Sequence, residues 1–281
     1  KTFSFNGKIL EGRNLIKGDL NGDGIPEFII GYRTFDNNLA KLAVFSFNDD
    51  LEPVHESNIL DFVAENQFVV DLSDFNGDGD DEIIIGFEDS ESDNYILRVY
   101  DFNSSFQATL KTENTPLLDY DMSEFKNATI TGVDYDNDGK EEFVIAFTKN
   151  ENDQPNYPDT YIYTGRVMDD PETGAINPLE LIKVYTENVS KGRFNYGSNW
   201  GILLKHGDLN GDGNQQILLG CRRGVVPINI ESENKLENAS NLSSSVNGFA
   251  KELISPNYFD VADITGDGRD DIAAVSHWFS S

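Results

Sequence analysis

Short apolar runs follow polar, glycine-containing segments at five places along the chain. The runs occupy residues 28–30, 83–85, 143–145, 217–219 and 272–274. Their length and their content of Ile, Val and Phe predict buried strands. Apolar residues also precede each polar segment. Each segment is therefore expected to join two consecutive strands.

Two further kinds of strand are expected in each unit. Residues 44–48 and 99–103 alternate between apolar and polar side chains, which is the period of a strand. Residues 108–111 and 179–185 supply a fourth strand downstream. No segment shows helical periodicity. The pattern predicts an all-β fold, a β-propeller of five four-stranded antiparallel blades.

The two ends of the chain suggest how this propeller closes. Residues 3–6 (Phe-Ser-Phe-Asn) repeat the text of residues 45–48, and Asn6-Gly7 signals a tight hairpin into residues 8–11. The last unit ends after its second strand, at 271–276. We expect the N-terminal hairpin to complete the C-terminal blade, which makes residues 1–281 one closed domain without a long free edge. The alternative is an excised stretch of a longer array.

The five polar segments share one nine-residue pattern. Each has Asp at positions one and five, Gly at position six, and Asn, Asp or Thr at position three; an acid stands at position nine in all but one. The first to fifth loops are residues 19–27, 74–82, 134–142, 208–216 and 263–271. Successive loops begin 55, 60, 74 and 55 residues apart. This period fits one small supersecondary unit per repeat.

With these five loops the sequence resembles the FG-GAP or VCBS family, the calcium-binding propeller repeats of integrin α-subunits and many bacterial surface proteins. The resemblance covers all five units and essentially the whole chain. It implies that each loop binds Ca²⁺ between the first and second strands of a blade. It also implies that ligands meet the face away from the calcium loops.

The chemistry of the loops agrees with calcium binding. Ca²⁺ takes six to eight oxygen ligands. Positions one, three and five offer side-chain oxygens, position seven a backbone carbonyl and position nine a carboxylate, while Gly at position six permits a positive φ. EF-hand loops need an acid near position twelve and flanking helices, whereas strands follow at once here. A solvated acidic turn is the alternative for any single loop, and five loops in register argue against it.

The predicted ligands are the residues at these positions. They are Asp19, Asn21, Asp23, Ile25 and Glu27 in the first loop; Asp74, Asn76, Asp78, Asp80 and Glu82 in the second; Asp134, Asp136, Asp138, Lys140 and Glu142 in the third; Asp208, Asn210, Asp212 and Asn214 in the fourth; and Asp263, Thr265, Asp267, Arg269 and Asp271 in the fifth. Gln216 replaces the ninth-position acid, so the fourth of up to five calcium sites should be the weakest or empty. Thr265 reaches less far than Asp or Asn, and water is expected to replace it.

Charge and composition restrict the classes of partner. The chain has 50 acidic and 21 basic residues, a formal net charge of −29. Such a surface repels nucleic acids and anionic membranes. No stretch approaches eighteen apolar residues, so no apolar helix spans a membrane. The one cysteine, Cys221, cannot form an internal disulfide. Because the chain starts at Lys1 without a leader, we expect a processed chain or an excised domain.

A partner is expected on the propeller face opposite the calcium loops. Residues 148–159, 187–199 and 241–257 are the longest and least repetitive segments there, and such loops on a rigid scaffold usually carry recognition. The candidate ligand-binding side chains are Tyr157, Phe194, Tyr196, Trp200, His277 and Trp278. The other interpretation is that these rings fill gaps between blades.

These observations favour a calcium-stabilised extracellular or cell-surface module, secreted or periplasmic, for binding or adhesion to a glycan or protein. We find no nucleophile elbow, phosphate-binding glycine loop or His-x-x-x-His pair, which argues against a recognisable active site. A polysaccharide lyase or hydrolase on the same scaffold is one alternative. A passive spacer within a larger surface protein is the other.

Overall fold

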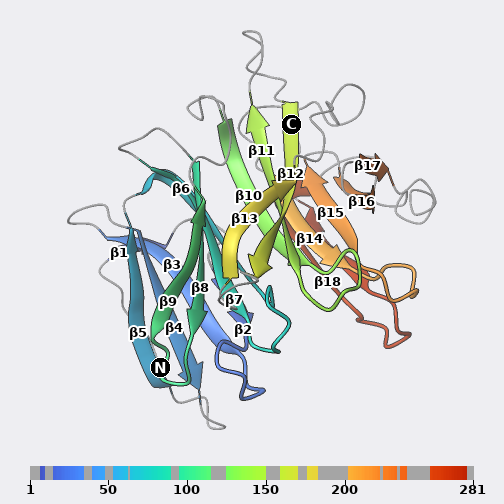
Figure 1. Cartoon of the computed structure of the whole chain (residues 1–281). Helices are drawn as coiled ribbons and strands as arrows, with labels where there is room; N and C mark the ends of the chain where they lie inside the picture. The colour runs from blue at the N-terminus through green and yellow to red at the C-terminus, as the bar shows by residue number, and fades with distance from the viewer. Residues whose placement is uncertain are drawn as a thin grey trace. The chain divides into compact units, whose positions relative to one another are not determined.

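The computed structural model describes residues 7–9, 15–34, 40–47, 53–62, 64–89, 95–114, 125–149, 159–169, 176–182, 202–221, 224–232, 235–238 and 254–276 (Figure 1). Within these residues the secondary structure is all-β, with no helix. Accordingly, none of the described segments is a helix of the length and apolar character that crossing a membrane requires. The prediction of an all-β chain is confirmed.

The strands form separate antiparallel sheets in chain order. The first sheet contains β1 (Gly7–Ile9), β2 (Leu15–Gly18), β3 (Glu27–Thr34), β4 (Ala40–Phe47) and β5 (Pro53–Phe62). The second contains β6 (Ala64–Ser73), β7 (Glu82–Asp89), β8 (Tyr95–Phe102) and β9 (Ala108–Asn114). The third contains β10 (Phe125–Val133), β11 (Glu142–Lys149), β12 (Asp159–Asp169) and β13 (Ile176–Ile182).

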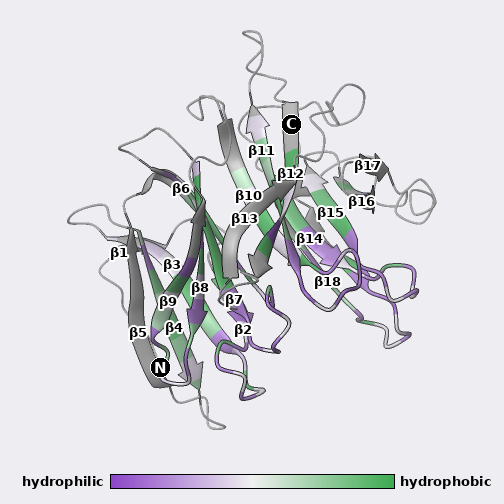
Figure 2. Ribbon diagram, in the orientation of Figure 1, coloured by the Kyte–Doolittle hydropathy of each residue, from purple (hydrophilic) through white to green (hydrophobic). Residues whose placement is uncertain are grey.

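The last two sheets follow the same order. The fourth contains β14 (Leu203–Gly207), β15 (Gln216–Cys221), β16 (Gly224–Ser232) and β17 (Lys235–Asn238). The fifth contains, within the described residues, β18 (Ile254–Ala262) and β19 (Asp271–Ser276). In every sheet the first eight residues of the nine-residue pattern separate two paired strands, and position nine begins the second of them. Figure 2 shows the apolar strands alternating with hydrophilic turns.

The N-terminal strand differs from the prediction. β1 pairs with β3, with Gly7 opposite Thr34 and Ile9 opposite Tyr32. The prediction that the N-terminal hairpin pairs with the C-terminal strands is therefore wrong for residues 7–9. Residues 3–6, the other strand of the predicted hairpin, lie outside the described residues. The physical reason is that β3 is longer than β2, so part of the edge of β3 is left for another strand. β2 covers only residues 27–30 of the eight-residue β3, and β1 pairs with the rest of that edge.

The chain divides into two compact units. The first comprises Lys1–Met122 and Val167–Glu180, and the second Ser123–Arg166 and Leu181–Ser281. In the first unit, Ile29, Leu42 and Val44 of the first sheet share a core with Val70, Ile83 and Ile85 of the second. In the second unit, one core includes Val144, Ala146, Leu204, Ile217 and Leu219, and another includes Leu218, Val225 and Phe259.

β15 explains why the apolar runs are continuous rather than alternating. Ile217 and Leu219 pack into one of these cores and Leu218 into the other, and all three are at most 1% exposed. Successive side chains of a strand point to opposite faces of the sheet, so burial of both faces requires every position to be apolar. The runs 83–85, 143–145 and 217–219 are buried throughout in this way. The prediction of buried strands is wrong for parts of the other two runs, because Phe28 is 40% exposed and Ala273 is also exposed.

Two pairs of loops are joined by the same reciprocal hydrogen bonds. The backbone N–H of Asp19 donates to Asp81 Oδ2 at 2.8 Å, and the Asp81 N–H donates to the Asp19 carbonyl at 2.7 Å. Asp208 and Asp270 repeat both bonds, each at 2.8 Å. We call this arrangement the aspartate clasp. In each pair the position-eight aspartate of one loop binds position one of the preceding loop, so neighbouring sheets are joined where the loops begin.

Loss of the Asp81 carboxylate is expected to destabilise the protein. In chelator, Asp81→Ala should lower the free energy of unfolding by about 1–3 kcal/mol, because the Asp19 N–H loses its acceptor. The control is Asp260→Ala, which removes an aspartate that is 78% exposed and paired with Lys205 at 3.2 Å; this change should cost less than about 1 kcal/mol. Denaturant unfolding measures both, and equal losses would contradict the clasp.

Candidate metal centres

The position-one aspartate organises each of the five loops. Its two carboxylate oxygens accept hydrogen bonds from the backbone N–H groups of positions five and six, at 2.7–3.2 Å, in every loop. The position-five carboxylate in turn accepts the N–H of position seven, at 2.8–3.0 Å. The five loops thus share one hydrogen-bond network as well as one sequence pattern.

Two positions of each loop have positive φ. Gly at position six has φ between 79° and 94° in all five loops, as the sequence predicts. Position four, which the sequence analysis did not single out, has φ between 60° and 79°: Gly occupies it in four loops and Asn137 in the third. Gly adopts this conformation freely, and Asn is among the residues that tolerate it. The recurrence of Gly at position four could therefore have predicted this second positive φ from the sequence.

The position-nine side chain closes the base of each loop. It accepts the backbone N–H of position two at 2.9–3.4 Å, from Leu20 to Glu27, from Phe75 to Glu82, from Tyr135 to Glu142, from Leu209 to Gln216 and from Ile264 to Asp271. Glu27 and Glu82 are each 1% exposed, and Glu142 is 2% exposed. In the first three loops an ionisable carboxyl is therefore buried beneath aspartates that are exposed or half-buried.

Burial makes these carboxyls resist ionisation. It raises the pKa of Glu82 to about 8, and the neighbouring Asp78, Asp101 and Asp74 add to the rise against the opposing hydrogen bond from Phe75. Burial likewise raises the pKa of Glu27 to about 7, with Asp23 and Asp19 contributing. A divalent cation among these carboxylates would offset both effects. The donor set, all hard oxygen atoms, fits Ca²⁺.

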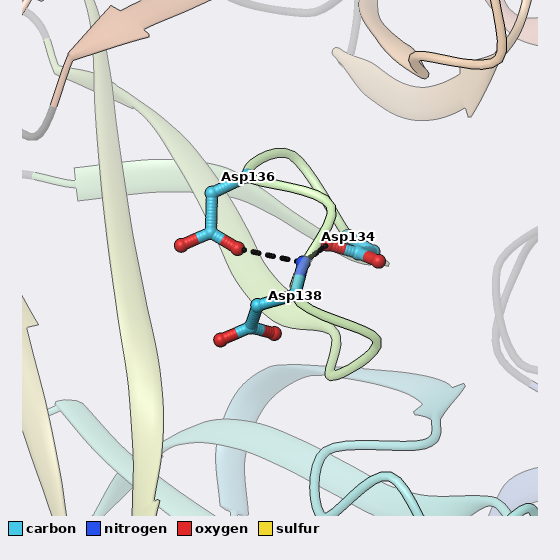
Figure 3. Close-up of side chains that lie close together, drawn as sticks. All are labelled: Asp134, Asp136 and Asp138. Carbon is cyan, nitrogen blue, oxygen red and sulfur yellow. Dashed lines mark hydrogen bonds between the residues drawn. The ribbon is translucent and has the colours of Figure 1, made fainter.

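The third loop brings three carboxylates together. Oxygens of Asp134, Asp136 and Asp138 all lie within 4.8 Å of one another (Figure 3), and no other such acidic, His or Cys group occurs among the described residues. The Asp138 N–H donates to both Asp134 Oδ1 and Asp136 Oδ1 at 3.2 Å, which turns the alternate side chains to one side. This cluster brings together the side-chain oxygens of positions one, three and five, as the sequence predicts for a cation site.

Arg166, which the sequence analysis missed, faces the same loop from β12. Its Nε lies 3.1 Å from Glu142 Oε1, and its Nη2 contacts Asp136 Oδ2. Burial and Asp136 raise the pKa of Glu142 to about 7, although the guanidinium opposes the rise. Only the pairing of β11 with β12 brings Arg166 to the loop, so the pattern within the nonapeptide contains no sign of it.

In the fourth loop the Gln216 amide performs two roles. Its Oε1 accepts the Leu209 N–H at 2.9 Å, as the glutamates do elsewhere, and its Nε2 donates to the Asn214 carbonyl at 2.6 Å. That carbonyl is the predicted position-seven ligand. An amide N–H therefore already occupies an oxygen that calcium would need. This contact favours the prediction that the fourth site is the weakest.

The fifth loop keeps the network with a shorter acid. Both Ile264 and Thr265 donate their N–H groups to Asp271 Oδ2 at 3.1 Å.

The predicted ligand-binding residues of the opposite face lie outside the described residues; they are Tyr157, Phe194, Tyr196, Trp200, His277 and Trp278. The structure thus places the predicted metal ligands in five loops and leaves the predicted partner site a prediction.

Comparison with known proteins gives structural neighbours only. No family model and no curated protein matches the chain. A lectin of Agrocybe aegerita, described as recognising non-reducing terminal N-acetylglucosamine, is 14% identical with a TM-score of 0.45; the match covers 92% of this chain and 59% of the lectin. The exotype rhamnogalacturonan lyase YesX is 14% identical with a TM-score of 0.43, over 95% of this chain and 57% of the lyase.

An α-L-arabinanase of Cellvibrio cellulosa, solved with arabinohexaose, is 9% identical with a TM-score of 0.41; the match covers 83% of this chain and 78% of the arabinanase. The chain therefore spans less than three fifths of the lectin and of the lyase, and more of the arabinanase.

The second and fourth loops provide a matched test of calcium binding. Asp78→Ala and Asp212→Ala each remove a position-five carboxylate that accepts the N–H of position seven, and Asp212 also accepts the Asn210 side-chain amide at 2.9 Å, so in chelator Asp78→Ala should cost no more than Asp212→Ala. In saturating calcium, Asp78→Ala should cost about 2–3 kcal/mol more, the binding free energy of one occupied site. Thermal unfolding with and without calcium measures the difference. Equal calcium-dependent losses would contradict the ranking of the two loops.

Proposed function

We propose that this chain is a calcium-stabilised β-propeller module of the FG-GAP or VCBS type, which binds a glycan or protein at the cell surface or outside the cell. The observation that carries the proposal is the repetition of one loop network in five places. In each place the loop lies between two paired strands and its position-nine side chain accepts the N–H of position two; in the first four loops that side chain is buried. A solvated surface turn does not need a buried acid.

Calcium would be held by the predicted ligands of each loop. When bound, it supplies positive charge to carboxylates that are otherwise close together and partly desolvated. The chain's own residues provide the rest: position one fixes the backbone of the loop, and position nine ties it to the following strand. Ion binding to the folded state alone stabilises that state.

The propeller arrangement is supported by the order of the strands. The sheets follow one another along the chain, and their first and second strands are joined by a loop of constant length. Within each unit, aspartate clasps join neighbouring loops. Repeated four-stranded sheets that contact their neighbours in sequence are the building plan of a propeller, for which we propose five blades.

The partner is assigned to the sheet ends opposite the loops. In an antiparallel sheet, the connections after the second and fourth strands leave from the end opposite the first turn. Chain segments 183–201 and 239–253 lie between β13 and β14 and between β17 and β18, respectively. The first contains Phe194, Tyr196 and Trp200. Aromatic rings provide flat apolar surfaces with polar edges, which suit sugar rings and peptides.

Binding and catalysis are separated by two assays on the same protein. A glycan array should reveal a ligand, and Trp200→Ala should weaken its binding at least about tenfold, the loss of one good aromatic contact. The control is Leu110→Ala on β9, which truncates an exposed apolar side chain (48% exposed) of the other compact unit. Shortening of a polysaccharide that Trp200→Ala abolishes would contradict a purely binding role, and absence of any glycan or protein ligand would indicate a spacer.

Chelation tests the metal part of the proposal independently of any partner. Removal of calcium should lower the melting temperature, because a site at one hundred times its dissociation constant contributes about 2.7 kcal/mol. Magnesium at the same ionic strength should restore little, since it prefers six ligands at shorter distances. Identical melting curves in calcium and in chelator would contradict calcium binding by these loops.

A further inference from the structure

The loops differ at the residue that pairs with position nine across the sheet. The registers of the first four sheets, continued by one residue, place Ser46 opposite Glu27, Asp101 opposite Glu82, Arg166 opposite Glu142 and Asn229 opposite Gln216. The four partners are neutral, anionic, cationic and neutral. Loops with nearly the same sequence therefore face cross-strand partners of different charge.

Arg166 bridges two of the predicted calcium ligands of the third loop. Its guanidinium pairs with Glu142 through Nε at 3.1 Å and with Asp136 through Nη2, and its Cζ lies 5.9 Å from the Tyr135 ring centroid. The Arg166 side chain is 28% exposed and that of Glu142 only 2%. The guanidinium thus spans from position three to position nine and neutralises a carboxylate that water hardly reaches.

The second loop has the opposite arrangement. Asp101 faces Glu82 and is itself paired with Lys111 at 2.6 Å, with both side chains about one third exposed. The strongest charged neighbours of Glu82 are Asp78, Asp101 and Asp74, all anionic. The second loop consequently gathers negative charge where the third loop has an internal positive charge.

We propose that Arg166 is a built-in counter-cation of the third loop, which competes with Ca²⁺ for Asp136 and Glu142. The inference rests on the proposed calcium binding and assigns this loop a different dependence on the ion. Although it has four acids, the third loop keeps its shape without calcium and binds the ion less tightly than the second loop. The guanidinium must leave Asp136 before that carboxylate can bind an ion.

Terbium, a luminescent calcium substitute, reports on this loop separately. Tyr135 is the only tyrosine at position two of the five loops. Tyrosine-excited emission that disappears in a Tyr135→Phe background therefore comes from the third loop. The variant is Arg166→Met, which keeps an apolar chain beside Tyr135. The control is Lys205→Met, which removes one positive charge from an exposed pair in the same unit.

The expected result is a selective gain of ion affinity. Arg166→Met should bind terbium at the third loop about tenfold or more tightly, because the ion no longer competes with the charge-assisted contacts of the guanidinium. In chelator it should melt at a lower temperature than the parent, because Glu142 is left buried without its cationic partner. Calcium should recover most of this loss. Lys205→Met should show neither effect.

The outcomes separate this inference from the proposed function. If calcium raises the melting temperature of the parent but the third-loop affinity of Arg166→Met equals that of the parent, the role of Arg166 is overturned and calcium binding stands. If neither protein responds to calcium or terbium, both proposals fail. Should Arg166→Met not fold even in calcium, Arg166→Lys replaces it. Lysine keeps the charge but cannot bridge two carboxylates, so a third-loop affinity equal to the parent's would overturn the proposal.

Discussion

The hydrogen bond between the backbone N–H of position two and the side chain of position nine is the contact on which the rest of the structure depends. It fastens each turn to the strand that follows, and it requires an acceptor in the interior of the protein. A glutamate in that place is costly to bury as an anion, and an ion or an internal cation can offset that cost. The position that shapes the loop is thus also the one that creates its demand for positive charge.

The loops meet this demand in different ways. The strongest charged neighbours of Glu27 and Glu82 are aspartates. Glu142 has both Asp136 and the cationic Arg166 beside it, whereas Gln216 carries no charge and bonds to the Asn214 carbonyl. A count of acids alone would rank the third loop highest. We instead place the third loop below the second, because the local electrostatic balance includes Arg166, a group that the nonapeptide does not contain.

Much of the fold was predictable because its signals are local. The apolar runs predicted β3, β7, β11, β15 and β19, and in β7, β11 and β15 the run is buried on both faces, which leaves no polar position. The loop pattern likewise predicted which oxygens gather at positions one, three and five. What could not be predicted depends on register. Arg166 becomes a neighbour of its loop only through pairing between strands, and the aspartate clasp forms only between adjacent sheets. β1 likewise pairs with the free edge of β3 and not with the C-terminal strands.

The aspartate clasp has a consequence for how such repeats can be exchanged. Asp19 offers its carboxylate to its own turn and its peptide group to the adjoining repeat, and Asp208 does the same. A single repeat grafted into another protein would leave a peptide N–H without its acceptor. The smallest transplantable piece of this architecture is therefore two consecutive repeats, with the successor contributing the aspartate.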